Sequence, residues 1–146
     1  MSKSNTWETD LLTLLFNNTA ASSIGDGVGL RGSSTAGSLY ISLHTSDPGE
    51  AGDQTTNETG YGAYTRIAVA RSSGGWIISG NQVTNAATVT FPQCTSGSST
   101  LSHFGIGTDS SGAGKLLYSG ALNSNLSVSA NIQPKFDAGL IIVNED

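Results

Sequence analysis

The sequence predicts an all-β fold, an antiparallel sandwich or a jelly-roll-like arrangement, with one short N-terminal helix. Two features of the composition point to it: the 146 residues include 19 glycines, and only 12% are charged. A third is the pattern of short runs in which apolar and polar residues alternate, separated by Gly, Asn and Pro. Many short strands with turn signals between them are typical of β sandwiches and barrels.

The helix is predicted near the N-terminus, where Asn5 or Thr6 can cap it and Glu8 lies at capping-box spacing from Asn5. Asn17-Asn18 is the expected stop. The apolar residues between follow helical spacing, and five of them are candidate interface residues: Trp7, Leu11, Leu14, Leu15 and Phe16. This stripe either packs on the chain's own sheet or docks on a neighbouring subunit. We favour docking, which makes residues 1–20 an N-terminal helical arm and residues 21–146 a single β domain.

Strand signals begin after a Gly/Ser-rich loop at residues 22–38. Gly74-Gly75 and Gly80-Asn81 are predicted hairpin turns, the second leading into Val83. The expected strands cover residues 39–44, 64–70, 76–78, 88–91, 102–106, 115–118, 126–128, 132–136 and 140–143.

Side chains that often carry chemistry form no recognisable catalytic motif. His44 and His103 lie in strand-like runs, and no nucleophile-elbow motif supplies a serine for either. Cys94 is the one cysteine, so no intrachain disulfide forms, and we expect it to be a small apolar filler. We therefore predict that the chain is not an enzyme and needs no cofactor.

Two further motifs match binding sites only superficially. Residues 27–32 fit G-x-G-x-x-G by letter, but no strand precedes them and no helix follows, so a loop is expected. Asp47, Glu50 and Asp53 lack the ligand spacing of an EF-hand, so we predict a solvated acidic loop with a turn at residues 47–49 and no metal.

Charge and hydropathy exclude several partners. The net charge is −5, and the basic residues are scattered, which argues against nucleic-acid binding. No apolar stretch approaches the length of a membrane span or of a signal-peptide core, so we expect the chain to be made and kept in a reducing cytoplasm. Tyr61, Tyr64 and Arg66 form a group of aromatics with a cation, which suits either an interface patch or cross-strand packing.

Several segments resemble a family of small virion proteins of tailed bacteriophages. The most distinctive are LHTSDP at residues 43–48 and NAATVTFP at residues 85–92, and the similarity runs over roughly residues 10–143. The other matching segments are residues 39–42, 64–69, 103–106 and 116–122. The family is labelled tail-fibre-like, and proteins of this size and β character also serve as capsid cement. The resemblance implies a location in the virion and supplies no catalytic residue.

From this resemblance we expect a capsid decoration (cement) protein that binds the major capsid protein lattice or other virion proteins. The N-terminal helix or the loop at residues 22–38 is its expected arm. The alternative is a receptor- or glycan-binding module of a tail fibre or tail tip. Capsid lattices present symmetry-related sites, and decoration is commonly by oligomers, so a homo-oligomer is expected.

Overall fold

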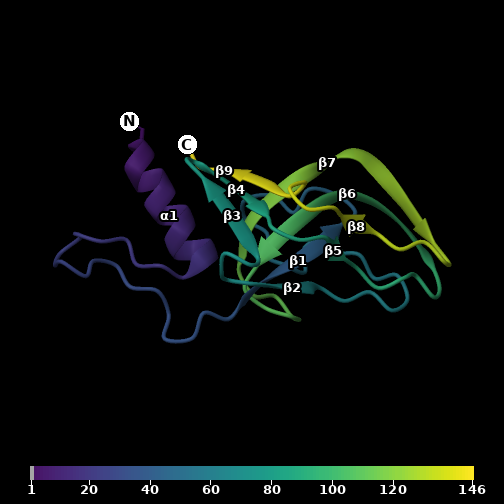
Figure 1. Ribbon diagram of the computed structural model, residues 1–146. Helices are drawn as coiled ribbons and strands as arrows, with labels where there is room; N and C mark the ends of the chain where they lie inside the picture. Colours follow the sequence, from purple (N-terminus) through teal and green to yellow (C-terminus); the bar gives the residue numbers. More distant parts are fainter. Residues whose placement is uncertain (1) are drawn as a thin grey trace. The chain divides into compact units, whose positions relative to one another are not determined.

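The computed structural model describes residues 2–146, and its internal contacts group the chain into two compact units. The first unit contains the chain up to Ser38 together with Val69–Thr88 and Phe136–Asp146. The second contains Leu39–Ala68 and Val89–Lys135. The predicted class is confirmed: the sheets are antiparallel and a short helix lies near the N-terminus (Figure 1). The predicted division at residue 20 stays a prediction.

The first unit is built on a three-stranded sheet of order β3-β4-β9. Its strands are β3 (Trp76–Ser79), β4 (Gln82–Asn85) and β9 (Ile142–Asn144). The predicted turn at Gly80-Asn81 joins β3 to β4 as an antiparallel hairpin, and Gly80 takes the positive φ of 61° that glycine tolerates best.

Helix α1 (Asn5–Asn17) packs against β3 and β4. Ser4 caps it, because its Oγ accepts from the Trp7 backbone N–H at 3.3 Å. The predicted caps, Asn5 and Thr6, are therefore wrong by one or two residues. The helix ends as predicted, with Asn18 in the left-handed conformation at φ 55°.

Arg71 secures the C-terminal end of α1. Its guanidinium donates to the carbonyls of Leu14 and Leu15 at 2.8 and 2.6 Å, and also to the Ala36 carbonyl at 3.1 Å and the Ser33 hydroxyl at 2.8 Å. A cation at this end satisfies open carbonyls and opposes the negative end of the helix dipole. One side chain thus holds the helix and the following loop together.

The two ends of the chain meet within the first unit (Figure 1). The Lys3 ammonium lies 3.2 Å from the Glu145 carboxylate and also donates to the Asp146 carbonyl. Between residues 2 and 146, no helix is long and apolar enough to cross a membrane.

Most of the larger sheet, of order β2-β1-β6-β7, belongs to the second unit. Its strands are β1 (Ser38–His44), β2 (Ile67–Ala70), β6 (Ser98–Gly107) and β7 (Leu116–Ser129). A two-stranded sheet pairs β5 (Val89–Thr90) with β8 (Lys135–Phe136). The core of this sheet includes Ile41 and Leu43 of β1 and Leu101 and Ile106 of β6, all of which are buried.

Two predicted features of the strands are wrong. The separate strands expected at residues 115–118 and 126–128 are parts of one long strand, β7, which is paired along β6. Gly74-Gly75 makes a turn, but not a hairpin, because β2 pairs with β1 whereas β3 pairs with β4. The Gly75 and Trp76 N–H groups instead both donate to the Ser72 carbonyl.

Candidate functional site

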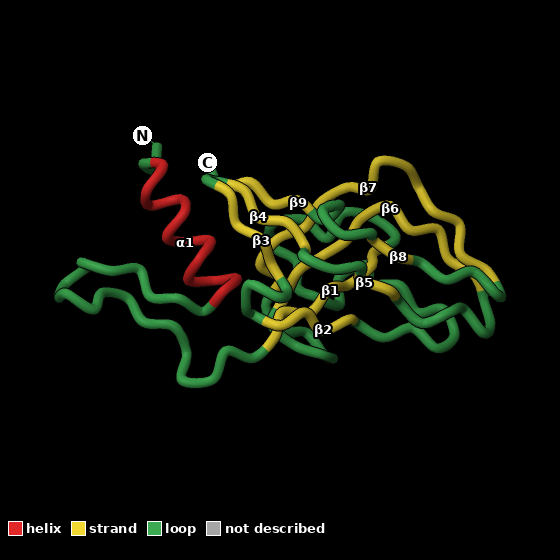
Figure 2. Tube along the Cα trace, viewed as in Figure 1, coloured by secondary structure: helices red, strands yellow, loops and turns green. Residues whose placement is uncertain are grey.

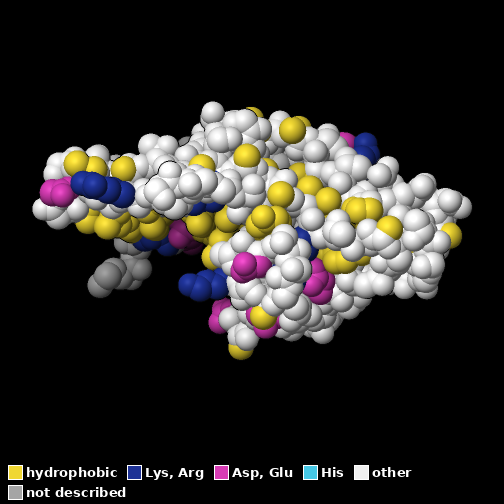
Figure 3. Space-filling view, turned by 90° about the horizontal axis from the view of Figure 1, so that it is seen from below, with side chains coloured by type: hydrophobic (Ala, Val, Ile, Leu, Met, Phe, Trp, Pro, Cys, Tyr) yellow, Lys and Arg dark blue, Asp and Glu magenta, His cyan; other side chains and the backbone are white. Residues whose placement is uncertain are grey.

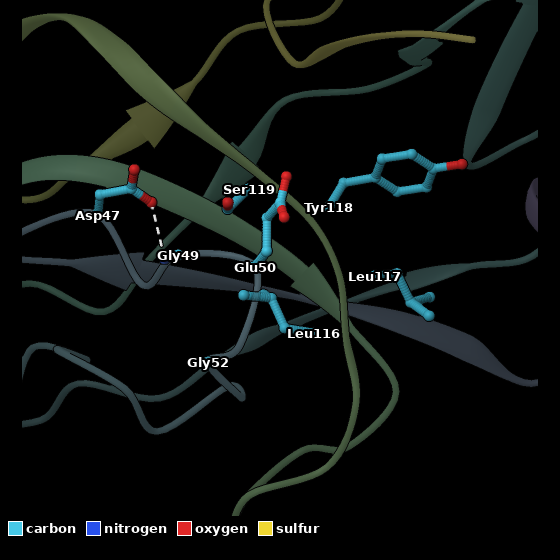
Figure 4. A pocket seen from close by; sticks show the side chains of 8 residues that line it. All are labelled: Asp47, Gly49, Glu50, Gly52, Leu116, Leu117, Tyr118 and Ser119. Atoms are coloured by element: carbon cyan, nitrogen blue, oxygen red, sulfur yellow. Dashed lines mark hydrogen bonds between the residues drawn. The ribbon is translucent and has the colours of Figure 1, made fainter. Parts of the chain in front are cut away.

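A surface groove of about 470 Å³ in the second unit is the best candidate site (Figure 4). One wall is the acidic loop that follows β1, and the other is the beginning of β7. The lining residues are Asp47, Gly49, Glu50, Gly52, Leu116, Leu117, Tyr118 and Ser119. Sequence analysis identified the acidic loop but did not place β7 beside it, because that proximity depends on long-range folding.

The acidic loop has a fixed shape. Asp47 Oδ1 accepts from the Gly49 N–H at 2.8 Å, which forms the predicted turn, and Gly49 adopts a φ of 70°. A Cβ on Gly52 would overlap the Pro48 carbonyl, so the next turn also requires glycine. Asn57 Nδ2 donates to the Asp47 carbonyl at 3.0 Å and closes the loop from the other side. The wall is therefore ordered before any ligand arrives.

His44 lies at the base of this loop, with no exposed surface. Its Nδ1 is 2.8 Å from the Thr56 carbonyl and its Nε2 is 2.8 Å from the Ser42 hydroxyl. Burial lowers the pKa of His44, against the opposing effect of the bond to Thr56. Nδ1 is then the donor to the carbonyl, and Nε2 accepts from Ser42.

This serine–histidine pair is enclosed. A Cβ on the neighbouring Gly105 would lie 2.7 Å from the Ser42 hydroxyl and 2.8 Å from His44 Nε2, so nothing larger than hydrogen fits there. Ser42 itself has no exposed surface. The pair lies within β1, and His44 joins this strand to the following loop through its bond to the Thr56 carbonyl. Enclosed in this way, Ser42 is not available to a substrate.

The chemistry of the groove is that of a binding site for polar, uncharged or cationic groups. Asp47 and Glu50 are exposed carboxylates, which accept hydrogen bonds, and the Ser119 hydroxyl both donates and accepts. Leu116 and Leu117 add apolar surface, and in Figure 4 the Tyr118 ring points away from the acidic loop. None of the eight lining residues is basic, which disfavours phosphate or other anions. Among residues 2–146, no three His, Cys, Asp or Glu side chains are grouped so as to hold a metal ion.

The five predicted interface residues of α1 have two different environments. Phe16 is fully buried, with its ring centroid 4.8 Å from that of Trp76 in an edge contact. The other four, Trp7, Leu11, Leu14 and Leu15, are half-buried. Leu12, which was not among the candidates, is also fully buried. Docking of the half-buried residues on another subunit stays a prediction.

Tyr61, Tyr64 and Arg66 do lie together in the second unit. The two tyrosine rings make an edge contact at 5.3 Å, and Tyr61 and Arg66 are only 4% and 8% exposed. Burial raises the pKa of Tyr61 to about 12 and that of Tyr64 further. Their role at an interface stays a prediction, but much of their surface is occupied within the chain.

Arg66 has a partner that sequence analysis did not identify. Its Nε and Nη2 each lie 2.7 Å from an oxygen of Glu58, and this pairing raises the pKa of Arg66. The guanidinium also donates to the carbonyls of Asp109 and Gly112 at 2.9 and 2.8 Å, and Tyr64 donates to Glu58 at 2.8 Å. These bonds tie the loop after β6 to the segment that enters β2.

Comparison with protein families gives a match over almost the whole chain. Residues 2–144 match the model of the family described as Gp80, Podophage GP4 fiber I protein gp80. No curated protein matches the chain.

Proposed function

This chain belongs to the Gp80 family of podophage GP4 fiber I proteins, and from that membership we propose that it is a non-catalytic component of a podophage tail fibre. A structural role in the phage virion follows from the family itself. The match over residues 2–144 supports the fibre location, because the description of the family names a fibre protein. The enclosed Ser42–His44 pair supports a role without catalysis.

The sequence alone placed capsid decoration first and the tail fibre second. The family description reverses this order of preference, since it names a fibre and no capsid protein. Binding to the major capsid protein therefore becomes the second candidate.

The copy number in purified virions distinguishes the two locations. A fibre component is expected in a small number of copies per particle, because a podophage has one tail, whereas a cement protein follows the many repeats of the capsid lattice. Quantitative mass spectrometry against the portal and major capsid proteins measures this ratio. Hundreds of copies per virion would contradict the fibre location.

Within the fibre, we propose that the groove binds a carbohydrate of the host surface. Sugar hydroxyls donate to carboxylates, and the C–H faces of sugar rings pack on apolar side chains. Glu50, Ser119 and Leu116 supply these three kinds of contact. The loop is ordered by the Asp47–Gly49 bond, so little conformational entropy is lost on binding.

Replacing Glu50 by alanine is expected to weaken binding of the purified chain to host cells about tenfold or more. A hydrogen bond to a charged group contributes about 1.5–3 kcal/mol, and this substitution removes such an acceptor. The measurement is a titration of labelled chain on host cells, repeated on cells whose sugars have been oxidised with periodate. The matched control is Asp10→Ala, which removes a carboxylate on α1, outside the groove.

Equal binding by Glu50→Ala and the wild type would exclude the groove. Undiminished binding to the oxidised cells would exclude a carbohydrate with vicinal hydroxyls. Neither result bears on the copy number, so the two parts of the proposal fail separately.

A further inference from the structure

The first unit carries a projecting loop whose shape is fixed by local hydrogen bonds. We call residues 21–32 the apolar loop; it extends away from α1 in Figure 2. Its base is clamped, because Asn18 Nδ2 donates to the Ser33 carbonyl at 2.9 Å and Asn18 Oδ1 accepts from the Ser33 N–H at 2.8 Å. Two backbone bonds of 2.9 Å between Ala21 and Leu30 close it further along.

The tip of the apolar loop is also fixed. Asp26 Oδ1 accepts from the N–H groups of Val28 and Gly29, both at 2.8 Å. Gly29 has a φ of 74°, and a Cβ there would overlap the Ala21 carbonyl, so only glycine allows the Ala21–Leu30 pairing. A surface loop with this many local bonds is preorganised, which reduces the entropic cost of a contact.

The apolar loop exposes large hydrophobic side chains, which a loop that only faces solvent does not need. Ile24, Val28 and Leu30 are 39%, 49% and 43% exposed. In the space-filling view, hydrophobic side chains gather on this projection at the left, beside an acidic and a basic side chain (Figure 3). Ordered exposed apolar groups of this kind mark an interaction surface.

A second exposed apolar surface lies on the sheet of the same unit. Ile77, Thr84 and Ile142 are neighbours across β3, β4 and β9, on the face that we call the outer face. Ile77 and Ile142 are 54% and 47% exposed, and Leu140, just before β9, is 63% exposed. The apolar loop and this surface together hold six of the eight large hydrophobic side chains exposed in residues 2–146: Ile24, Val28, Leu30, Ile77, Leu140 and Ile142.

The apolar loop cannot cover the outer face of its own copy. Side chains alternate between the two faces of a strand, so Trp76 lies on the face opposite Ile77. Phe16 contacts Trp76, which places α1 on that opposite face. The apolar loop starts at the C-terminal end of α1 and is held there by Asn18 and Arg71. The loop and the outer face therefore lie on different sides of one sheet.

We propose that the apolar loop of one copy packs on the outer face of a second copy of this chain. One contact of this kind removes both sets of apolar side chains from water. The rest of the outer face is polar but uncharged, with Ser79, Gln82 and Asn144, so neither charge of the loop, Asp26 or Arg31, meets a like charge there. Because the two surfaces differ, the contact is head-to-tail, and it closes into a ring or extends as a filament.

The test is disulfide trapping between two single-cysteine variants, Val28→Cys and Ile142→Cys. Native Cys94 is 1% exposed and does not compete. When the two purified variants are mixed and mildly oxidised, we expect a covalent dimer that contains one copy of each. Val28→Cys mixed with Ser124→Cys, an exposed position of β7, is the matched control.

Two outcomes would overturn the proposal. One is a yield for the Val28→Cys and Ile142→Cys mixture no higher than for the control mixture. The other is an equal yield from Val28→Cys alone, which would indicate a loop-to-loop contact instead. As a second measure, Val28→Asp is expected to abolish trapping between Leu30→Cys and Ile142→Cys while leaving the thermal unfolding midpoint unchanged. All of these experiments use purified chain, so their outcome is independent of the copy number in virions.

Discussion

Replacing Phe16 by alanine is expected to lower the free energy of unfolding by about 3–5 kcal/mol. The ring is fully buried and meets Trp76 at 4.8 Å, so its removal loses apolar burial and leaves a cavity between α1 and β3. Chemical denaturation followed by tryptophan fluorescence measures the change, and Trp76 reports on the contact directly.

The matched control is Leu15→Ala, on the same helix but half-buried, for which about 1 kcal/mol is expected. This pair also tests the predicted helical arm. If α1 served only to dock on other subunits, Phe16→Ala would leave the unfolding free energy within about 0.5 kcal/mol of the wild type and would impair assembly instead.

Replacing Arg66 by methionine is expected to cost about 3–5 kcal/mol, because it leaves a largely buried carboxylate without its partner. The Arg66 and Glu58 side chains are 3% and 15% exposed. The substitution also removes the donors to the carbonyls of Asp109 and Gly112, so the loop after β6 loses its attachment. Urea denaturation monitored by circular dichroism measures the loss.

The double variant Glu58→Gln with Arg66→Met separates the charge from the packing. It is expected to recover part of the stability, since the neutral amide no longer leaves a charge unpaired while still accepting from Tyr64. Arg31→Met, at an exposed arginine, is expected to change stability by less than about 0.5 kcal/mol. A cost below about 1 kcal/mol for Arg66→Met would contradict a structural role for the pair.

The sequence correctly predicted the elements that depend on residues close together in the chain. The alternation at residues 39–44 corresponds to β1, and the Gly80-Asn81 signal corresponds to the β3–β4 hairpin. Asn18 ends α1 within the expected Asn17-Asn18 stop, and the expected turn at Asp47 forms, with an Asx bond to Gly49. Each of these features depends on residues within a few positions of one another.

Features set by long-range pairing were not predictable in this way. The middle of β7 is rich in Ser, Asn and Gly and therefore has little strand propensity. It forms a strand because it pairs with β6. The groove requires β7 beside the loop at residues 47–52, and no sequence pattern relates these two segments. Likewise, Glu58 and Arg66 are eight positions apart in a segment without helical spacing, so their pairing shows only in the structure.

The meeting of the two chain ends has a practical consequence for engineering. Because Lys3 pairs with Glu145, a reporter fused to either end emerges from the same point of the first unit. A short linker between the ends would allow circular permutation, with new termini opened in an exposed turn whose backbone groups hold no other segment. The same geometry means that bulky fusions at both ends would compete for one space and would separate Lys3 from Glu145.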